Sequence, residues 1–231
     1  MLLMPIMIIS CGALTTPPTN TIYSNSISTL GNNHFEGRYG FGAYLSETNN
    51  KFMDVAISIP INSINDVQLC AISNDLMLYK SNDESDMWVT GRGLQINIHH
   101  GLKNNNEVAF KYGIGVENST AGYYASPNIG LMIGRENEYI STSMSIDSYL
   151  SYPWQTKNVD HINGNLLDFT TVHSVSIERL STTVGLQVFP AIDVYFTKYI
   201  SIHGGIIFGV ARSKYGVSKS IGLESSLSGT I

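Results

Sequence analysis

The sequence predicts an all-β fold: an antiparallel up-and-down meander of about ten strands that closes into a transmembrane β-barrel. Three observations favour this fold. Apolar side chains alternate with small or polar ones along most of the 231 residues, as in strands with two different faces. Clusters of Asn, Asp, Ser, Gly and Lys separate these segments as turns would. No stretch of about ten residues has a helical period. Counts of about eight or about twelve strands are the alternatives.

The N-terminal residues 1–11 form an apolar run that ends in Ile8-Ile9-Ser10-Cys11. This ending resembles the lipobox of bacterial lipoproteins, which implies a signal-like leader, an acylated Cys11 and a flexible tether over residues 12–34. The barrel domain is then expected over residues 35–231. The alternative is an apolar leader that ends in a chance cysteine, because signal sequences begin with positive charge and the first Lys or Arg here is Arg38.

The first half of the barrel domain is expected to contain the strands 37–46, 51–59, 66–80, 87–101 and 107–116. ETNN and KNNN separate neighbouring strands as hairpin turns would. In 87–101, the apolar Leu94, Ile96 and Ile98 alternate with polar residues. The third strand has a candidate break at residues 73–75. Cys70 has no partner for a disulfide if Cys11 is acylated, so it is expected to be a small apolar strand residue.

The second half is expected to contain the strands 122–134, 139–150, 183–196, 199–212 and a final strand from about 217. RENE, Thr197-Lys198 and SKYG provide the turns, and residues 151–182 are irregular. Two hairpins, over 127–141 and 190–201, share the same order of Pro, apolar alternation, turn and Tyr-Ile-Ser. They are expected to turn at the same end of the sheet, which requires an even number of strands that cross the barrel between them. The strand-like residues 168–180 are therefore expected to lie outside the barrel, as an excursion, rather than to form a crossing strand.

The two faces of residues 107–116 predict which side of the sheet meets the membrane. Phe110, Tyr112 and Ile114 lie on one face, whereas Gly113 and Gly115 lie on the other. A soluble sheet would carry Lys, Glu, Thr and Arg on its non-apolar face. Small side chains instead suit the narrow interior of a barrel, so the apolar face is expected to point outward into lipid. An aromatic belt at the strand ends is expected from Tyr123, Tyr124, Tyr139, Tyr149, Trp154, Tyr195 and Tyr199.

The segment FPAIDVYFTKYISIHGGIIFG, residues 189–209, resembles the penultimate hairpin of small bacterial outer-membrane β-barrel proteins. The resemblance extends as a pattern over most of residues 37–231. It implies a location in the bacterial outer membrane, with membrane lipid as a partner. The last residue is Ile231, whereas such barrels usually end in an aromatic residue.

Composition and motifs argue against several other classes of function. Charged residues make up only 13% of the chain, the net charge is −5, and no basic cluster is present, which disfavours binding of nucleic acid. No phosphate-binding glycine motif occurs and no cofactor is expected. His99 and His100 are neighbours on a strand, so they point to opposite faces and cannot share a metal from one surface. His99 is expected in the barrel interior.

Ser201 and His203 are the enzymatic candidates, because they place a hydroxyl and an imidazole on the same strand face. This face is the inner one, whereas a lipid hydrolase would act at the lipid boundary, and no acidic residue that would orient His203 is evident. His173 and Ser174 invite the same comparison and fail in the same way. A hydrogen-bonded interior histidine without a catalytic role is the favoured interpretation.

The expected function is therefore a structural or surface-binding one without catalysis. A barrel of about ten strands has an interior nearly filled by side chains, which disfavours conduction like that of a large porin. An extracellular ligand or envelope protein is expected to meet the loop 151–182, where Tyr152, Trp154 and His161 are the candidate contacts. The alternatives are a soluble lipocalin-like lipoprotein that carries an apolar ligand and a lipid-modifying barrel enzyme.

Overall fold

Ten of the strands form one closed antiparallel barrel. The structure is a computed structural model that describes residues 35–44, 50–79, 87–102, 105–119, 122–156, 159–163, 171–175, 182–213 and 216–230. The strands are β1 (Glu36–Tyr44), β2 (Asn50–Asn62), β3 (Asn65–Tyr79), β4 (Met87–Leu102), β5 (Asn105–Ser119), β6 (Gly122–Glu136), β7 (Ile140–Thr156), β8 (Val159–Asn163), β9 (Thr171–Val175), β10 (Thr183–Thr197), β11 (Ile200–Ser213) and β12 (Gly216–Thr230). The predicted leader, the tether and Cys11 lie outside the described residues.

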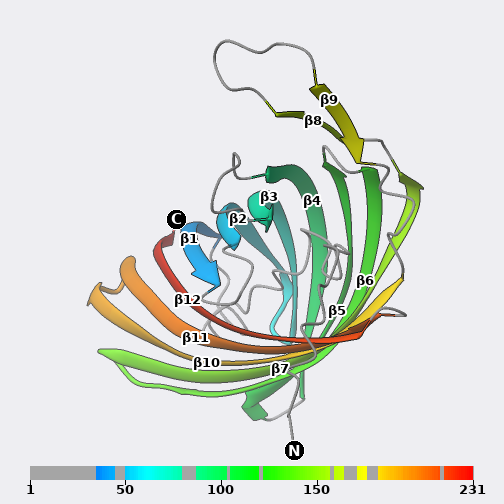
Figure 1. Ribbon diagram of the computed structural model, residues 1–231. Coiled ribbons are helices and arrows are strands. Elements are labelled where there is room, and N and C mark those ends of the chain that lie inside the picture. The colour runs from blue at the N-terminus through cyan, green and yellow to red at the C-terminus, as the bar shows by residue number, and fades with distance from the viewer. Residues whose placement is uncertain are drawn as a thin grey trace, which may run out of the picture.

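The order of strands around the barrel is β1-β12-β11-β10-β7-β6-β5-β4-β3-β2. Strands that are neighbours in the sequence pair with each other, apart from two contacts. β1 pairs with β12, which closes the barrel, and β7 pairs directly with β10, from Thr183 opposite Ser151 to Val194 opposite Ile140. Strands β8 and β9 pair with each other and form a separate hairpin. The predicted fold class, the count of ten strands and the excursion between the two hairpins are confirmed. Figure 1 shows β8 and β9 apart from the barrel.

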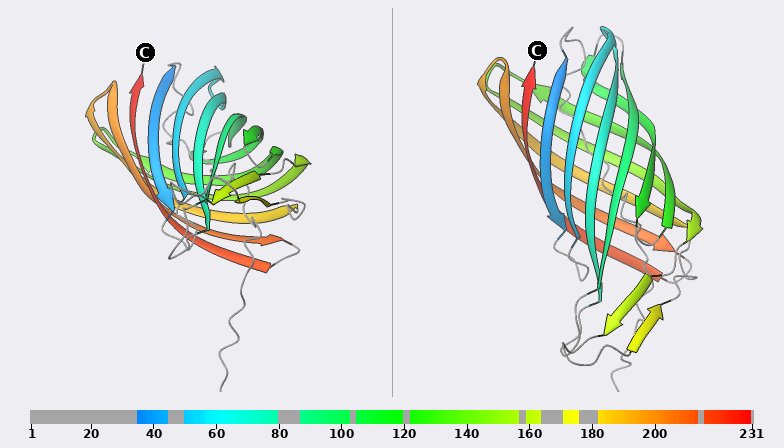
Figure 2. Two further views of the ribbon diagram at one scale, coloured as in Figure 1. Left: turned by 45° about the horizontal axis from the view of Figure 1, so that its top comes forward. Right: turned by 90° about the horizontal axis from the view of Figure 1, so that it is seen from above.

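The two ends of the barrel differ in their connections. The turns β2–β3, β4–β5, β6–β7 and β10–β11 are short and lie at one end, which we call the lower end. Strands β1 and β12 also begin and finish there, because Glu36 pairs with Thr230. The predicted common end of the hairpins 127–141 and 190–201 is confirmed. The other end, which we call the upper end, carries the β8–β9 hairpin; in the right-hand view of Figure 2 this end lies at the bottom, opposite the C-terminus.

The structure differs from the predicted strands at two places, one in β3 and one in β7. Strand β3 runs through residues 73–75 without a break, because a ladder on both sides holds its backbone extended. Strand β7 continues to Thr156, six residues beyond the predicted end at 150. Tyr152 and Trp154 therefore belong to a barrel strand rather than to an irregular loop. Pairing with β6 holds this extension in place, with Ala125 opposite Tyr152.

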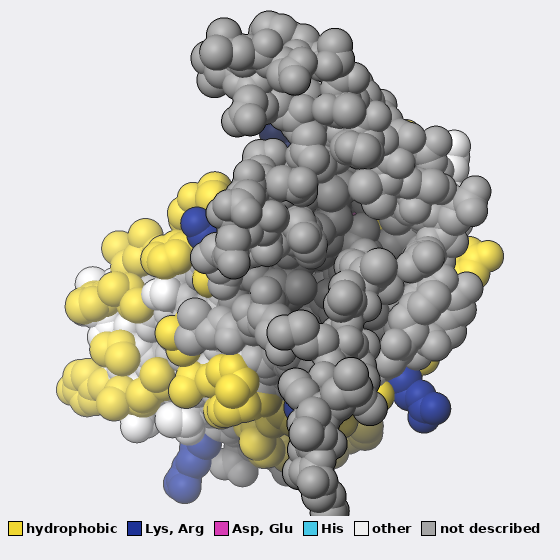
Figure 3. Space-filling view, viewed as in Figure 1, with side chains coloured by type: hydrophobic (Ala, Val, Ile, Leu, Met, Phe, Trp, Pro, Cys, Tyr) yellow, Lys and Arg dark blue, Asp and Glu magenta, His cyan; other side chains and the backbone are white. Residues whose placement is uncertain are grey.

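The orientation of the two faces is confirmed. Phe110, Tyr112 and Ile114 of β5 are exposed on the outer surface, whereas Ala109 and Lys111 are completely buried in the interior, which we call the lumen. The same alternation recurs on the other barrel strands, and large apolar side chains cover the outside. Figure 3 shows such side chains gathered over β10 and β11 at the lower left of the view.

Candidate functional site

Polar side chains fill the lumen, and near the lower end two of them form a buried Asp–His pair. Asp66 on β3 lies directly opposite His99 on β4 in the antiparallel ladder. The Nδ1 atom of His99 is 2.6 Å from Oδ1 of Asp66, and both side chains are buried. The alternation of the strands explains the contact, because side chains directly opposite each other share one face. The predicted interior position of His99 is confirmed.

A second Asp–His pair has the same geometry. Asp193 on β10 lies directly opposite His203 on β11, and Nδ1 of His203 is 2.8 Å from Oδ1 of Asp193. The expectation that His203 lacks an acidic neighbour is therefore wrong. The sequence pattern does not reveal Asp193 as this neighbour, because the two residues are not close in the chain. The hairpin between β10 and β11 brings them together.

The two pairs face each other across the lumen. Three strands (β5, β6 and β7) separate the β3–β4 pair from the β10–β11 pair on one side, and three (β1, β2 and β12) separate them on the other. In each pair Nδ1 of the imidazole faces the carboxylate, while Nε2 is buried and has no hydrogen-bond partner among the described residues. The two imidazoles are therefore oriented alike on opposite walls.

Ser201 and His203 lie on the same inner face, as predicted, and both are buried. Within the described part of the chain, however, no hydrogen bond joins the Ser201 hydroxyl to the His203 imidazole. A serine nucleophile needs its base within hydrogen-bond reach. The arrangement thus contains an oriented imidazole but not the contact that would activate Ser201.

Ion pairs between oppositely charged side chains also occupy the lumen. Nζ of Lys111 is 2.9 Å from Oδ1 of Asp147, and neither side chain is exposed. Arg38 pairs with Glu224 through Nη2, and its Nε lies 4.0 Å from Oδ2 of Asp54. A buried charge is costly unless an opposite charge and hydrogen bonds compensate it. These pairs therefore fix the side chains that fill the lumen.

A network of hydrogen-bonded amide side chains lies on the lumen wall. Nδ2 of Asn97 donates to Oε1 of Gln68 over 2.9 Å, and Nε2 of Gln95 donates to Oδ1 of Asn97 over 3.1 Å. Nδ2 of Asn128 donates to the same oxygen over 3.2 Å. The network joins three strands, because Gln68 lies on β3, Gln95 and Asn97 on β4, and Asn128 on β6. Polar networks of this kind hold a single arrangement.

Large side chains also point inward, which the sequence patterns did not reveal. Tyr124 and Tyr149 were expected in the outer aromatic belt, but their exposed fractions are only 1% and 5%. A glycine explains how Tyr149 fits: a Cβ atom at Gly185 would collide with the ring of Tyr149 on the neighbouring strand. An apolar cluster of Phe52, Ala56, Cys70, Ile72, Phe189 and Ile207 fills another part of the lumen.

The candidate partner contacts are divided between two elements. Tyr152 and Trp154 project outward from the upper part of β7, with exposed fractions of 52% and 56%. The Trp154 ring lies 6.4 Å from that of Tyr123, centroid to centroid. His161 belongs to β8, where its backbone pairs with His173. The expected contacts are therefore not one loop but a strand end and a neighbouring hairpin.

Among the residues that the structure describes, no group of three His, Cys, Asp or Glu side chains is placed to hold a metal ion. Within the same ranges, no helix has the length and apolar character needed to cross a membrane.

Comparisons with known proteins found similarity in structure only. No family model matches the sequence, and no curated protein matches it. Among solved structures, the KdgM porin has 9% identity and a TM-score of 0.39, with 85% of this chain and 99% of that chain covered.

The translocator domain of the autotransporter NalP from Neisseria meningitidis has 9% identity and a TM-score of 0.44, with 88% and 90% covered. The N-terminal β-barrel domain of OprF from Pseudomonas aeruginosa has 10% identity and a TM-score of 0.35, with 86% and 98% covered. Similarity at these levels says nothing about the function of this chain.

Proposed function

We propose that this chain is a small β-barrel of the bacterial outer membrane with a structural or surface-binding role. The proposal rests mainly on the distribution of side chains, which is the reverse of that in a soluble protein: large apolar side chains are exposed and charged side chains are buried. Exposed fractions are 48% for Ile114, 41% for Ile206 and 50% for Leu223, whereas Lys111 and Asp147 have none. In water this arrangement would expose the apolar surface and bury the charges, both of which cost free energy. In a bilayer the same apolar surface lies in hydrocarbon.

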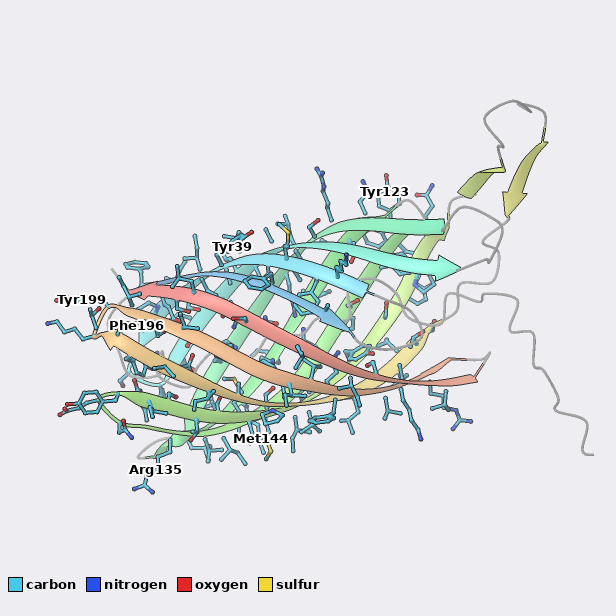
Figure 4. The ribbon with its side chains drawn as sticks, turned by 60° about the vertical axis from the view of Figure 1, so that its left-hand side comes forward. Tyr39, Tyr123, Arg135, Met144, Phe196 and Tyr199 are labelled. Atoms are coloured by element: carbon cyan, nitrogen blue, oxygen red, sulfur yellow. The ribbon has the colours of Figure 1, made fainter. Side chains whose placement is uncertain are left out.

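Strand length and aromatic placement support the proposal. Strand β11 has 14 residues, which span about 46 Å at about 3.3 Å per residue. A tilt of about 40° still leaves about 35 Å along the barrel axis, enough to cross a hydrocarbon core of about 30 Å. Tyr139, Phe196 and Tyr199 are exposed at the lower end, where Figure 4 labels Phe196 and Tyr199. Aromatic rings are favoured at membrane interfaces.

The proposed orientation places the lower end in the periplasm. Outer-membrane barrels have short periplasmic turns and longer extracellular loops. In this chain all four connections at the lower end are short. The upper end has two equally short connections, β5–β6 and β11–β12, but also the longer connections β1–β2 and β3–β4 and the β8–β9 hairpin. The hairpin, with the nearby Tyr152 and Trp154, would then be available to an extracellular ligand or envelope protein.

The rival function of a soluble carrier of an apolar ligand fits the lumen poorly. Such a carrier needs an apolar interior to hold its ligand. The lumen instead contains buried charges and amides, including Asp66, Lys111 and Gln68. Because these side chains occupy the lumen, the arrangement also disfavours conduction through a wide pore.

A second candidate function, lipid hydrolysis, is favoured by one observation: Asp193 orients His203 close to Ser201 along β11. The inner position of both side chains supports a non-catalytic role instead. The folded protein would be incubated with phospholipid and with lipid A. Release of fatty acid that is lost in His203→Ala would establish catalysis, and no release from the wild type would support the non-catalytic role.

Two experiments test the membrane assignment. The full chain would be extracted from cell envelopes with and without detergent, and its gel mobility compared before and after boiling. Extraction only with detergent and a heat-dependent mobility are expected. Release into buffer with unchanged mobility would refute the assignment. Acylation of Cys11 is proposed as well, and it predicts that Cys11→Ser removes the mass of the attached lipid from the mature protein.

A further inference from the structure

The charged side chains that the structure describes on the outer surface of the barrel strands are all of one sign. Among the strand residues whose side chains the structure describes, every charged side chain that points outward is a cation, and each is exposed: Lys51, Arg92, Arg135, Arg212 and Lys219. The strand carboxylates with described side chains all follow the inner alternation instead: Glu36, Asp54, Asp66, Glu117, Glu136, Asp147, Asp193 and Glu224. Among the described side chains, the surface proposed to face lipid therefore presents cations that attract anions and no competing carboxylate.

Four of these cations lie toward the upper end. Lys51 and Lys219 are near the upper starts of β2 and β12, and Arg212 is near the upper end of β11. Arg92 lies deeper, five residues below the start of β4 at Met87. A charged residue at that depth on the lipid-facing surface is unfavourable unless it can reach a polar headgroup or a counter-charge. Among the described residues, no ion pair involves Arg92.

Arg92 borders an apolar groove on the outer surface with a volume of about 600 Å³. The register explains the hollow. On β3 the outward residues Ala71 and Ser73 are small, and they lie between larger neighbours on both sides. On β2 these neighbours are Val55 and Met53, and on β4 they are Leu94 and Arg92. A groove of this size is within the usual range for small-molecule sites.

Polar and aromatic groups are concentrated at one edge of this groove. Arg92, Asn118, Tyr123 and Trp154 all line it, and Asn118 pairs across the ladders with both Arg92 and Tyr123. Figure 4 shows Tyr123 near the upper end of the barrel and Tyr39, another lining residue, farther down. The groove thus joins an apolar floor to a cationic, amphipathic edge, which matches a lipid with an acyl chain and an anionic headgroup.

We propose that this groove binds a phosphorylated glycolipid of the outer leaflet, with its acyl chain over Ala71 and its phosphate at Arg92. The inference rests on the proposed membrane location and orientation, which place the upper end in the outer leaflet. Arg holds phosphate through paired charge-assisted hydrogen bonds. Trp154 and Tyr123 can pack on the lipid while their polar edges stay at the interface.

The test uses the full chain, purified in detergent, with lipid A as the probe and phosphatidylglycerol and phosphatidylethanolamine as comparisons. Bound lipid would be counted by native mass spectrometry over a range of lipid concentrations. Arg92→Gln is expected to weaken lipid A binding about tenfold or more, the effect of losing one charge-assisted contact. Arg135→Gln is the matched control, because Arg135 is an exposed outward cation at the lower end. It should bind like the wild type.

A second variant probes the apolar part of the site. Ala71→Leu fills the groove without changing charge and should also weaken lipid A binding. Heat-dependent mobility would confirm that each variant is folded. Equal lipid A binding by the wild type and Arg92→Gln would overturn the proposal. So would equal losses in Arg92→Gln and Arg135→Gln, phosphatidylglycerol binding as tight as lipid A, or dimers in place of bound lipid.

The outcomes separate this inference from the proposed function. A protein that is heat-modifiable and needs detergent, yet shows no dependence on Arg92, would retain the membrane assignment and lose only the lipid site. A protein that extracts into buffer would lose both.

Discussion

His203 and Asp193 face each other from neighbouring strands in the lumen, with Nδ1 of the imidazole 2.8 Å from Oδ1 of the carboxylate. His99 and Asp66 repeat this relationship on the opposite wall at 2.6 Å. In each pair the carboxylate is the hydrogen-bond partner of Nδ1 of the imidazole, which would otherwise be buried without a partner. The repeated geometry indicates that these pairs stabilise the lower part of the barrel.

Replacing Asp193 with Ala should therefore destabilise the barrel. The substitution leaves Nδ1 of His203 buried without its acceptor, which costs about 1–3 kcal/mol. The free energy of unfolding would be measured with guanidinium in lipid vesicles, followed by tryptophan fluorescence. Lys198→Ala, in the exposed turn between β10 and β11, is the control and should change stability by less than about 0.5 kcal/mol. Equal stability of both variants would contradict a structural role for the pair.

The neighbouring glycines Gly204 and Gly205 should respond differently to substitution. A Cβ at Gly205 would lie 2.5 Å from the ring of Phe189 and 2.9 Å from the carbonyl oxygen of Pro190, whereas at Gly204 the nearest atom is 3.9 Å away. Gly205→Val should therefore prevent the heat-modifiable form, while Gly204→Val should retain it. Gel mobility of the refolded variants measures both. Normal folding of Gly205→Val would show that the lumen near Phe189 can adapt.

A charge on the middle of the outer face should be costly only in a membrane. Ile206 lies near the centre of β11 and is exposed on the outer surface. Ile206→Arg should lower the free energy of unfolding in vesicles by about 2–4 kcal/mol, the cost of Arg near the bilayer midplane. Phe196→Arg, at the lower end, should cost at most about 1 kcal/mol beyond its lost packing. A neutral or stabilising effect of Ile206→Arg would argue that this surface meets water.

Lys111 and Asp147 should show strong coupling in a double-mutant cycle. Lys111→Met leaves the Asp147 carboxylate buried with Ser145 as its recorded hydrogen-bond donor at 2.8 Å, and loss of such a partner costs about 3–5 kcal/mol. Adding Asp147→Leu removes the orphaned charge and should recover most of the loss. The unfolding free energies of the two single variants and the double variant measure this coupling. Simple additivity of the single effects would show that the two charges do not stabilise each other.

The β8–β9 hairpin should be dispensable for the barrel. Because β7 pairs with β10 directly and β8 and β9 pair only with each other, replacing residues 159–175 with a short Gly-Ser linker should leave heat-dependent mobility intact. If this hairpin contacts an extracellular ligand, binding of that ligand to cells should fall. Loss of the folded barrel would instead assign the hairpin a role in assembly.

The sequence alone determined the fold class, the strand count and the orientation of the faces. These follow from local patterns: alternation with a period of two assigns each residue to a face, and turn residues mark the reversals. The position of the segment between β7 and β10 outside the barrel also followed from the sequence. Strand direction reverses at every crossing, so two matching hairpins that turn at the same end require an even number of crossings between them. Local alternation could also assign Ser201 and His203 to the inner face.

Only the tertiary structure decided which residues meet within that interior. The contact of Asp193 with His203 depends on the register of a hairpin, and a shift by one residue would reverse every face. The inward position of Tyr149 depends on space left by Gly185 on a neighbouring strand. The groove at Arg92 arises because small side chains on β3 align with larger ones on β2 and β4. The pairing of strands and the closure of the sheet bring together residues that are far apart in the chain. A local sequence pattern contains no information about which of these residues meet.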